Sequence, residues 1–309
     1  MNREKNFVSA VIYIHNAEKR IAMFLQMVKQ TLEENFEHSE IICVNDCSSD
    51  ASVEQIRMIS KDAQHTNISV LNMSYFHGME PAMNAGVDLS IGDFVFEFDS
   101  TVIDYEAELI MQVYRRALEG FDIVSASPNR KQQLTSKWFY RMFDRFSHLS
   151  YHMSTESFRI LSRRVINRIG SMNKSVPYRK AVYANCGLKT DNLIYQVIDK
   201  AEEWDKEEKK YRRRLAVDTL ILFTDMGYRF SITMTVLMML FAVFVVGYTV
   251  FTYLFSTPVE GWTTTILFLS VAFFGLFGIL TVIIKYLQLM IELIFKRKRY
   301  SFESIEKLT

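Results

Sequence analysis

Residues 40–50 read EIICVNDCSSD, a short apolar run that passes directly into a polar turn rich in Asp and Ser. Residues 7–14 (FVSAVIYI) form a second apolar run, which is typical of a strand that is covered on both faces. Two more apolar runs and three segments with helical periodicity alternate with these, at 69–73, 94–98, 21–32, 53–64 and 81–89. The alternation predicts an α/β domain with a doubly wound, mostly parallel sheet over about residues 1–200.

The polar residues that follow these strands are the candidate site, because ligands of such sheets bind beyond the carboxyl ends of the strands. His15 and Asn16 follow the first strand, Asn45 and Asp46 the second, and Asp99 the fourth. Helix capping is the alternative for Asp46, because an Asp side chain can accept from the free N–H groups at the start of a helix.

The last third of the chain differs from the rest. Residues 230–259 and 261–284 contain no charged side chain, and each run exceeds the roughly 20 residues that a membrane-spanning helix needs. They predict two transmembrane helices, about 231–255 and 262–284, within the segment 230–295. Basic residues flank the pair and are absent from its connecting turn, so both chain ends are expected in the cytoplasm. A buried hairpin in a soluble protein is the alternative.

The remaining segments are expected to lie close to the membrane. Residues 131–153 combine aromatic side chains at helical spacing with Lys and Arg, which predicts a helix in the membrane interface, with a core-packed helix as the alternative. Residues 201–229 predict a charged juxtamembrane helical region, and 296–309 a basic cytoplasmic tail. The expected location is the cytoplasmic (inner) membrane, as a multi-pass protein.

Charge and cysteine content exclude other classes. The chain has 309 residues, with 36 Lys and Arg against 35 Asp and Glu, and a net charge of +1 argues against a nucleic-acid partner held by a basic field. The three cysteines, Cys43, Cys47 and Cys186, match neither a disulfide framework nor a metal site, and they fit a reducing compartment.

Six polar motifs follow one another along the chain. They are 13–18 (YIHNAE), 45–50 (NDCSSD), 78–86 (GMEPAMNAG), 92–93 (GD), 99–101 (DST) and 156–163 (ESFRILSR). In this order, and followed by a membrane hairpin, they resemble the family 2 glycosyltransferases of the polyprenyl-phosphate type, such as dolichol-phosphate mannose synthase and bactoprenol glucosyltransferase. The resemblance implies a GT-A fold, which is Rossmann-like, and a glycosyltransferase activity.

The resemblance also implies a nucleotide-sugar donor, either a UDP- or a GDP-sugar. The residues that correspond to donor-binding positions of the family are His15, Asn16, Glu18, Asp46, Ser48 and Glu80. Catalytic roles are implied for Asp99, Asp104 and Arg159. Residues 178–187 match no motif, and no role is predicted for them.

A divalent cation, Mg²⁺ or Mn²⁺, is implied at Asp99 and Thr101, because carboxylate oxygens are the ligands that such cations prefer. The sequence departs from the family here, since Thr101 stands where the family has the second Asp of its Asp-x-Asp motif. Glu97 lies two residues before Asp99, on the same face of the strand, and is either a substitute ligand or an ordinary strand residue.

The acceptor implied by the resemblance is a polyprenyl phosphate, undecaprenyl or dolichyl. Arg159 and Arg163 are spaced i, i+4, and guanidinium groups match phosphate oxygens, so both are expected to bind the acceptor phosphate; a solvated helix face is the alternative. Ser157 replaces an Asp of the family, but a phosphate acceptor is already ionised and needs little help from a base.

Three functions stay open at this point. The first is an inverting transfer of one sugar to a polyprenyl phosphate. The second is transfer to a glycan or glycolipid hydroxyl, for which Glu156 or Asp104 is the candidate base. The third is a catalytically degenerate partner subunit, because two family motifs are altered. The resemblance also admits a homo-oligomer assembled through the hairpins.

Overall fold

The computed structural model describes residues 3–129, 156–171, 179–184, 186–198 and 300–309, together with individual positions between 233 and 290. The chain divides into two compact units. The first contains Met1–Asp144, Leu149–Ala216 and Arg297–Thr309, and the second contains Arg145–His148 and Val217–Lys296. The candidate site lies in the first unit.

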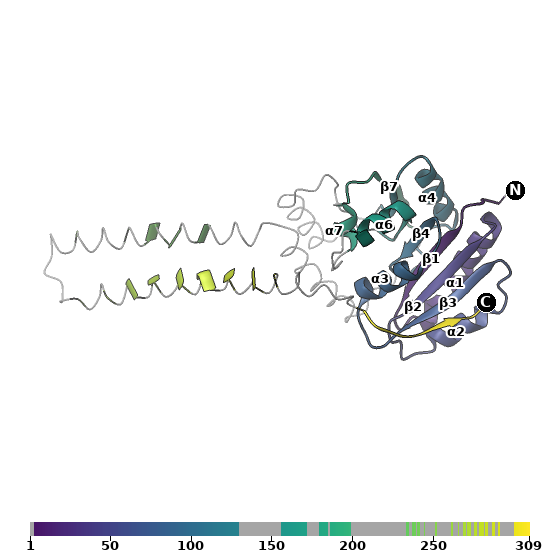
Figure 1. Cartoon of the computed structure of the whole chain (residues 1–309), viewed down its shortest axis with the longest axis horizontal. Coiled ribbons are helices and arrows are strands. Elements are labelled where there is room, and N and C mark those ends of the chain that lie inside the picture. The colour runs from purple at the N-terminus through teal and green to yellow at the C-terminus, as the bar shows by residue number, and fades with distance from the viewer. Residues whose placement is uncertain are drawn as a thin grey trace. The chain divides into compact units, whose positions relative to one another are not determined.

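A sheet runs through the first unit, with the described strands in the order β7-β5-β6-β4-β1-β2-β3-β8 (Figure 1). The strands are β1 Val8–Ile14, β2 Ser39–Asn45, β3 Thr66–Met73, β4 Phe94–Phe98, β5 Ile123–Pro128, β6 Phe158–Ser162, β7 Thr190–Tyr195 and β8 Phe302–Lys307. The four strands predicted from apolar runs form the parallel centre, β4-β1-β2-β3. β6 lies antiparallel between β4 and β5, and β7 is parallel to β5. The predicted α/β, mostly parallel sheet is confirmed.

Helices cover both faces of the sheet. The described helices are α1 Glu18–Asn35, α2 Ser52–Ser60, α3 Met79–Leu89, α4 Glu108–Leu118, α6 Arg163–Ser171 and α7 Arg179–Ala184. α1, α2 and α4 share one core cluster with alternate residues of β1, whereas α3 packs on the opposite face, against Val11, Val44 and Val95. The predicted apolar stripe of α1 is buried at Ile21, Phe24, Leu25, Val28 and Leu32.

Gly86 lets α3 approach the sheet closely. A Cβ atom at this position would lie 2.4 Å from Val11 Cγ1 and 2.6 Å from Val44 Cγ2, far inside normal contact distance. Because α3 begins directly after the loop from β3, this close packing also fixes the loop that borders the candidate site.

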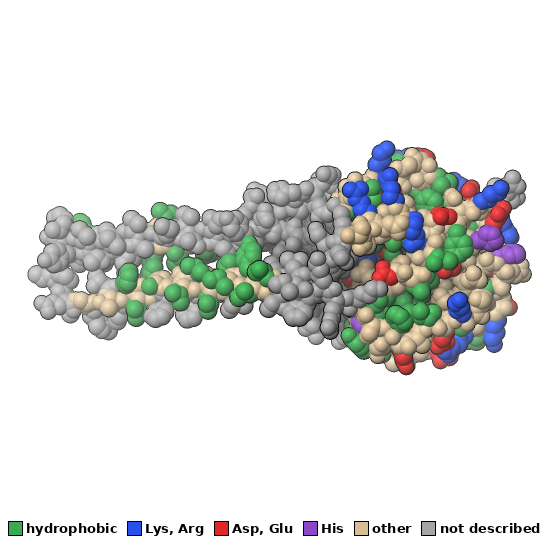
Figure 2. Space-filling model, in the orientation of Figure 1, with side chains coloured by type: hydrophobic (Ala, Val, Ile, Leu, Met, Phe, Trp, Pro, Cys, Tyr) green, Lys and Arg blue, Asp and Glu red, His purple; other side chains and the backbone are tan. Residues whose placement is uncertain are grey.

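The second unit includes the segment predicted to span a membrane. Its described positions between 233 and 290 are helical, apart from Gly261 in a turn. Large apolar side chains are exposed at these positions (Figure 2), among them Leu240, Phe244, Phe268 and Leu276. No helix within the described residues is long and apolar enough to cross a membrane. The predicted spans, the interfacial helix at 131–153 and the region 201–229 lie wholly or partly outside the described residues.

The C-terminal residues return to the first unit. For 296–309 the sequence predicted only a basic tail, but Phe302–Lys307 form β8, which pairs antiparallel with the edge strand β3. Arg57 forms an ion pair with Glu306 at 2.9 Å, and the Ile68 amide donates to Thr309 Oγ1 at 2.7 Å. Main-chain pairing with an open sheet edge, which has no periodic sequence signal, explains why this strand was missed.

Candidate functional site

Asp46, at the end of β2, is fully buried and holds the segment that leads into α3. Its carboxylate accepts hydrogen bonds from the Tyr13 hydroxyl at 3.0 Å and from the amides of His77 and Gly78, both at 2.8 Å. Gly78 has a φ of 85°, which a residue with a side chain rarely adopts. Asp46 therefore shapes the loop after β3, and its predicted contact with a donor stays a prediction.

The loops after β1 and β2 are tied together by predicted donor-binding residues. The Asn16 amide donates to Ser48 Oγ at 3.1 Å, and His15 Nδ1 lies 2.7 Å from the Asp46 carbonyl oxygen. Glu18 accepts from the Ala51 amide at 3.2 Å. The structure thus brings these predicted residues together at the carboxyl ends of two neighbouring strands.

Aromatic rings lie beside this pair of loops, and the sequence reasoning did not identify them. The rings of Tyr75 and His77 are stacked with centroids 3.9 Å apart, and His15 lies 4.7 Å from Phe76. Tyr75 is 60% exposed and Phe76 is 49% exposed. Exposed planar rings of this kind can stack on a nucleobase.

Arg159 lies at the centre of a buried charge cluster. Its side chain is 1% exposed and donates to three carboxylates. Nη1 donates to Glu97 at 2.8 Å, Nη2 to Asp99 at 2.8 Å and Nε to Glu156 at 2.9 Å. All the donor edges of this guanidinium therefore face carboxylates.

Arg179, the first residue of α7, enters the same cluster from a segment for which no role was predicted. Its Nε and its backbone amide both donate to Glu80, each at 2.9 Å, and its Nη2 donates to Asp99 at 2.5 Å. Nη1 lies 3.0 Å from Glu97, close enough for an ion pair although its orientation does not make a hydrogen bond. Glu97 also accepts from the Tyr183 hydroxyl at 2.6 Å.

The two guanidinium groups determine the charge state of Asp99. Burial alone would raise the pKa of this carboxyl, but Arg179 and Arg159 hold its pKa well below the usual range. Burial likewise opposes the charge of both guanidinium groups, while the surrounding carboxylates raise the pKa of each well above its ordinary value. Asp99 and the two guanidinium groups are therefore ionised at neutral pH.

The residues present do not fit the predicted divalent cation. One oxygen of Asp99 accepts from Arg159 and the other from Arg179, so both oxygens already face a cation. Thr101, the second predicted ligand, is buried. In the part of the chain that the structure describes, no three His, Cys, Asp or Glu side chains are grouped so that they could hold a metal ion.

The helical spacing assumed for Arg159 and Arg163 is wrong, whereas their predicted binding of an acceptor phosphate stays a prediction. Residues Phe158–Ser162 form strand β6, so the i, i+4 spacing does not place the two side chains together. Arg163 begins α6 and donates through Nε to the Gly92 carbonyl oxygen at 2.8 Å. Arg159 faces Glu97 and Asp99 instead of a free phosphate site.

The other predicted residues have partners within the fold. Asp104 accepts from the Tyr195 hydroxyl at 2.6 Å, and that hydroxyl lies 2.6 Å from Ser157 Oγ. Glu80, predicted to bind the donor, is buried and binds Arg179. Glu97 and Asp99 point to the same side of the sheet, as predicted. Arg159 and Arg179 each contact both of these carboxylates.

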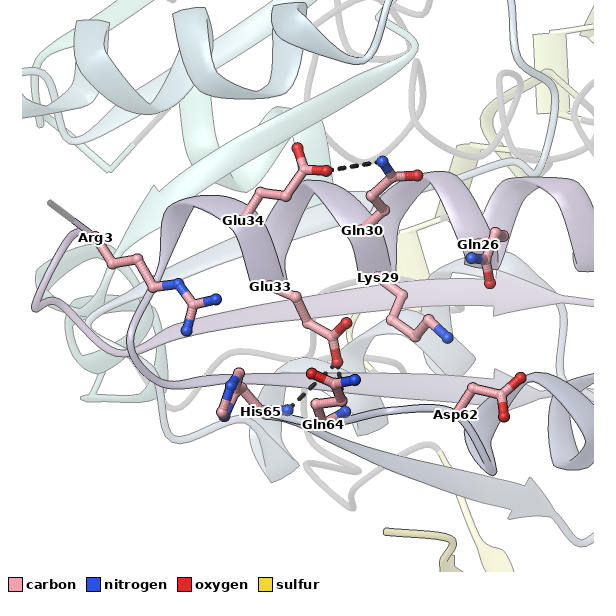
Figure 3. A pocket seen from close by; sticks show the side chains of 9 residues that line it. All are labelled: Arg3, Gln26, Lys29, Gln30, Glu33, Glu34, Asp62, Gln64 and His65. Carbon is pink, nitrogen blue, oxygen red and sulfur yellow. Dashed lines mark hydrogen bonds between the residues drawn. The ribbon is translucent and has the colours of Figure 1, made fainter. Parts of the chain in front are cut away.

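A pocket of about 350 Å³ lies elsewhere, along α1 and the loop before β3 (Figure 3). Lys29 and Glu33 of α1 lie on the side that faces Asp62 and His65. The end of α1 and the start of β3 lie at the amino-terminal edge of the parallel strands, opposite the edge that carries Asp46 and Asp99. The pocket therefore contains none of the predicted site residues.

The strand order, the helices on both faces and the polar loops beyond β1, β2 and β4 define a GT-A fold domain. The chain belongs to glycosyl transferase family 2, whose model matches residues 9–175. This membership confirms the predicted family.

Relatives in this family include a glycosyltransferase of Synechocystis that is 29% identical over 61% of this chain and 60% of its own length. The bactoprenol glucosyl transferase of Shigella phage SfV is 24% identical over 87% of this chain and 88% of its own. A prophage bactoprenol glucosyl transferase homolog of Escherichia coli K12 is 27% identical over 61% and 62%. The match thus spans about three fifths of the Synechocystis and E. coli relatives and most of the phage protein.

Among solved structures, a mannosyltransferase from Pyrobaculum calidifontis, in complex with GDP-Man and Mn²⁺, aligns with a TM-score of 0.50 at 12% identity. The alignment covers 68% of this chain and 61% of that one. A mycobacterial protein aligns with the same score at 13% identity. At these identities the likeness concerns the fold.

Proposed function

We propose that this protein transfers one sugar from a nucleotide-sugar donor to a polyprenyl phosphate at the cytoplasmic face of a membrane. The observation that carries the proposal is the match to the bactoprenol glucosyl transferase of phage SfV, because it extends through 87% of this chain, well beyond the family 2 domain. The name of that relative, bactoprenol glucosyl transferase, contains both a lipid and a transferred glucose.

The donor is proposed to lie at the loops after β1, β2 and β3. Support comes from the exposed rings of Tyr75 and Phe76 and from the loop geometry that Asp46 imposes through the His77 and Gly78 amides. The mannosyltransferase structure with the same fold contains GDP-Man and Mn²⁺, which supports a nucleotide-sugar donor and the use of divalent metal by this fold in general. Because Asp99 already faces two guanidinium groups, no step of the proposed reaction passes through a metal here.

The proposed reaction is a single in-line displacement. An ionised oxygen of the acceptor phosphate attacks the anomeric carbon of the sugar and forms the new C–O bond. The bond from that carbon to the donor's diphosphate breaks on the opposite face, and the nucleoside diphosphate leaves with the electron pair. The acceptor oxygen carries no proton near neutral pH, so the site requires no strong general base.

A membrane location is proposed from the second unit. Exposed Leu240, Phe244 and Phe268 at helical positions are what a lipid-facing helix carries. β7 and β8 belong to one sheet, so the intervening chain leaves the first unit and returns to it. An even number of membrane crossings, as in the predicted hairpin, agrees with that return.

The test uses the full chain purified in detergent, with a panel of UDP- and GDP-sugars and undecaprenyl phosphate. We expect nucleotide release that depends on the lipid, and its loss in Asp99→Asn, because this change removes one charge from the cluster that surrounds Arg159 and Arg179. Asp62→Asn is the matched control, since Asp62 is exposed and lies outside the site. Release from no donor, in protein shown to be folded, would contradict the proposal.

A second candidate is a partner subunit that binds a nucleotide sugar without transferring the sugar. The observation that favours it is the engagement of both Asp99 oxygens by arginines. Nucleotide binding without release, in the presence of every acceptor, is the result that would select this candidate.

A further inference from the structure

We propose that Arg159 and Arg179 take the place of the divalent cation at Asp99, so that the site binds its nucleotide without a bound metal. The inference rests on the proposed function, because it concerns the diphosphate of the same donor. It also reverses one expectation, since the resemblance predicts Mg²⁺ or Mn²⁺ at this carboxylate.

The first argument is the geometry around Asp99. Arg159, in β6, reaches Oδ2 at 2.8 Å, and Arg179, at the start of α7, reaches Oδ1 at 2.5 Å. A divalent cation would need at least one of these oxygens, and it would then lie within a few ångströms of two permanent positive charges. Repulsion at that distance, in a buried place of low dielectric, opposes metal binding.

The second argument is the balance of charge in the cluster. Its four carboxylates are those of Glu80, Glu97, Asp99 and Glu156, and its cations are Arg159, Arg179 and Lys180, whose Nζ lies 3.8 Å from Glu156. Four negative charges against three positive ones leave a net charge of about −1. A divalent cation is therefore not required to neutralise the acidic residues that the fold gathers here.

The third argument is that the substitution in the sequence and the arginine pair explain each other. Thr101, where the family has an Asp, removes one carboxylate from the loop after β4. Arg179 comes from α7, far along the chain, and brings to Asp99 a guanidinium that also binds Glu80 and Glu97. The loss of a metal ligand at position 101 and the presence of the buried Arg179 at Asp99 have one common explanation. A guanidinium has replaced the metal ion as the counter-ion of Asp99.

The test is a Mn²⁺ titration of the full chain in detergent, followed by electron paramagnetic resonance of the free ion. We expect no saturable site in the wild type. Binding of UDP and GDP, measured by calorimetry, should stay within about twofold between EDTA and added Mn²⁺, because no charged contact differs between the two conditions. One tight Mn²⁺ site per chain that disappears in Asp99→Asn would overturn the proposal.

The variant Arg179→Met tests the arginine itself. We expect nucleotide affinity in EDTA to fall roughly tenfold or more, since removal of one partner leaves buried carboxylates uncompensated. Arg115→Met is the matched control, because Arg115 is exposed on α4 and pairs with Glu108. Unchanged nucleotide affinity in Arg179→Met would count against the proposal. If the Met variant does not fold, Arg179→Lys, which keeps the charge, is measured in its place.

The outcomes separate this proposal from the proposed function. Nucleotide binding that requires Mn²⁺ would leave the transferase proposal standing and overturn the arginine substitution. If neither UDP nor GDP binds, in EDTA or in Mn²⁺, both the proposed transferase and the proposed metal-free nucleotide binding are contradicted. The Mn²⁺ titration alone would still decide whether the arginines exclude the cation from Asp99.

Discussion

At the scale of single residues, the site depends on side chains that are fully engaged inside the protein. Asp46 fixes the loop before α3 through two backbone amides, and Asp99 is held between two guanidinium groups. Residue types and spacing identified both aspartates. They did not identify Arg179 or Tyr183, because a contact between α7 and β4 depends on long-range packing and leaves no periodic pattern in the sequence.

The depressed pKa of Asp99 predicts a specific sensitivity to acid. A carboxyl whose pKa is lower in the folded than in the unfolded chain stabilises the fold fully above its unfolded value of about 3.9, and this contribution is lost as the pH falls below that value. We expect the melting temperature of the wild type to fall more steeply from pH 6 to pH 3 than that of Asp99→Asn. Parallel curves for the two proteins would contradict the assignment of the ion pairs.

The cysteines offer a second prediction at this scale. Cys43 lies in β2, and burial raises the pKa of its thiol to about 12, whereas Cys47 is exposed in the following turn. Because the thiolate is the reactive form, iodoacetamide at pH 8 should modify Cys47 in the folded protein and leave Cys43 unmodified. Peptide mass spectrometry reads both sites, and equal labelling of the two would contradict the buried position of β2.

At the scale of the elements, sequence patterns predicted those with a clear period. The four central strands and the helices α1, α2 and α3 appear close to their expected bounds, because apolar runs and helical spacing directly reflect which faces are buried. β6 was missed because the spacing of Arg159, in the strand, and Arg163, just after it, was interpreted as helical. β8 was missed because its residues are exposed or half-buried at a sheet edge. Short strands such as β6 and β8 form because neighbouring strands are available to pair with them, so their own sequences do not reveal them.

Gly86→Ala tests the packing of α3 on the sheet. The added methyl group would meet Val11 and Val44 at less than 3 Å, so we expect a loss of about 1–3 kcal/mol in the free energy of unfolding, as for other overpacked cores. Chemical denaturation measures it. Gly170→Ala on α6, where a Cβ meets nothing within 4 Å, is the control, and equal stability of the two variants would show that α3 packs less closely.

Removal of residues 300–309 tests the edge strand β8. The Ser74 amide donates to the Ser301 carbonyl oxygen at 3.2 Å and the Ile68 amide to Thr309 Oγ1 at 2.7 Å, so hydrogen exchange at both amides should accelerate in the shortened chain. Ile12, at the centre of the sheet in β1, is the internal control. Unchanged exchange at Ser74 and Ile68 would contradict the pairing of β8 with β3.

At the scale of the whole molecule, two units have different surfaces. The first is an α/β domain with its site at one edge of the sheet, and the second exposes large apolar side chains at helical positions. The lipid acceptor that we propose would connect the two, because an enzyme that acts on a lipid phosphate must be held at the depth of the headgroups. The family was predictable from ordered motifs, whereas the counter-ion of Asp99 required the structure.

The most direct test of the central claim is the product. The full chain is incubated with the donor that gives the strongest nucleotide release and with either undecaprenyl phosphate or undecaprenol, and the lipid extract is analysed by mass spectrometry. We predict a glycosylated lipid phosphate from undecaprenyl phosphate and no product from undecaprenol, because only the phosphate supplies an ionised oxygen. Glycosylated undecaprenol, or no glycolipid from either acceptor, would contradict the account.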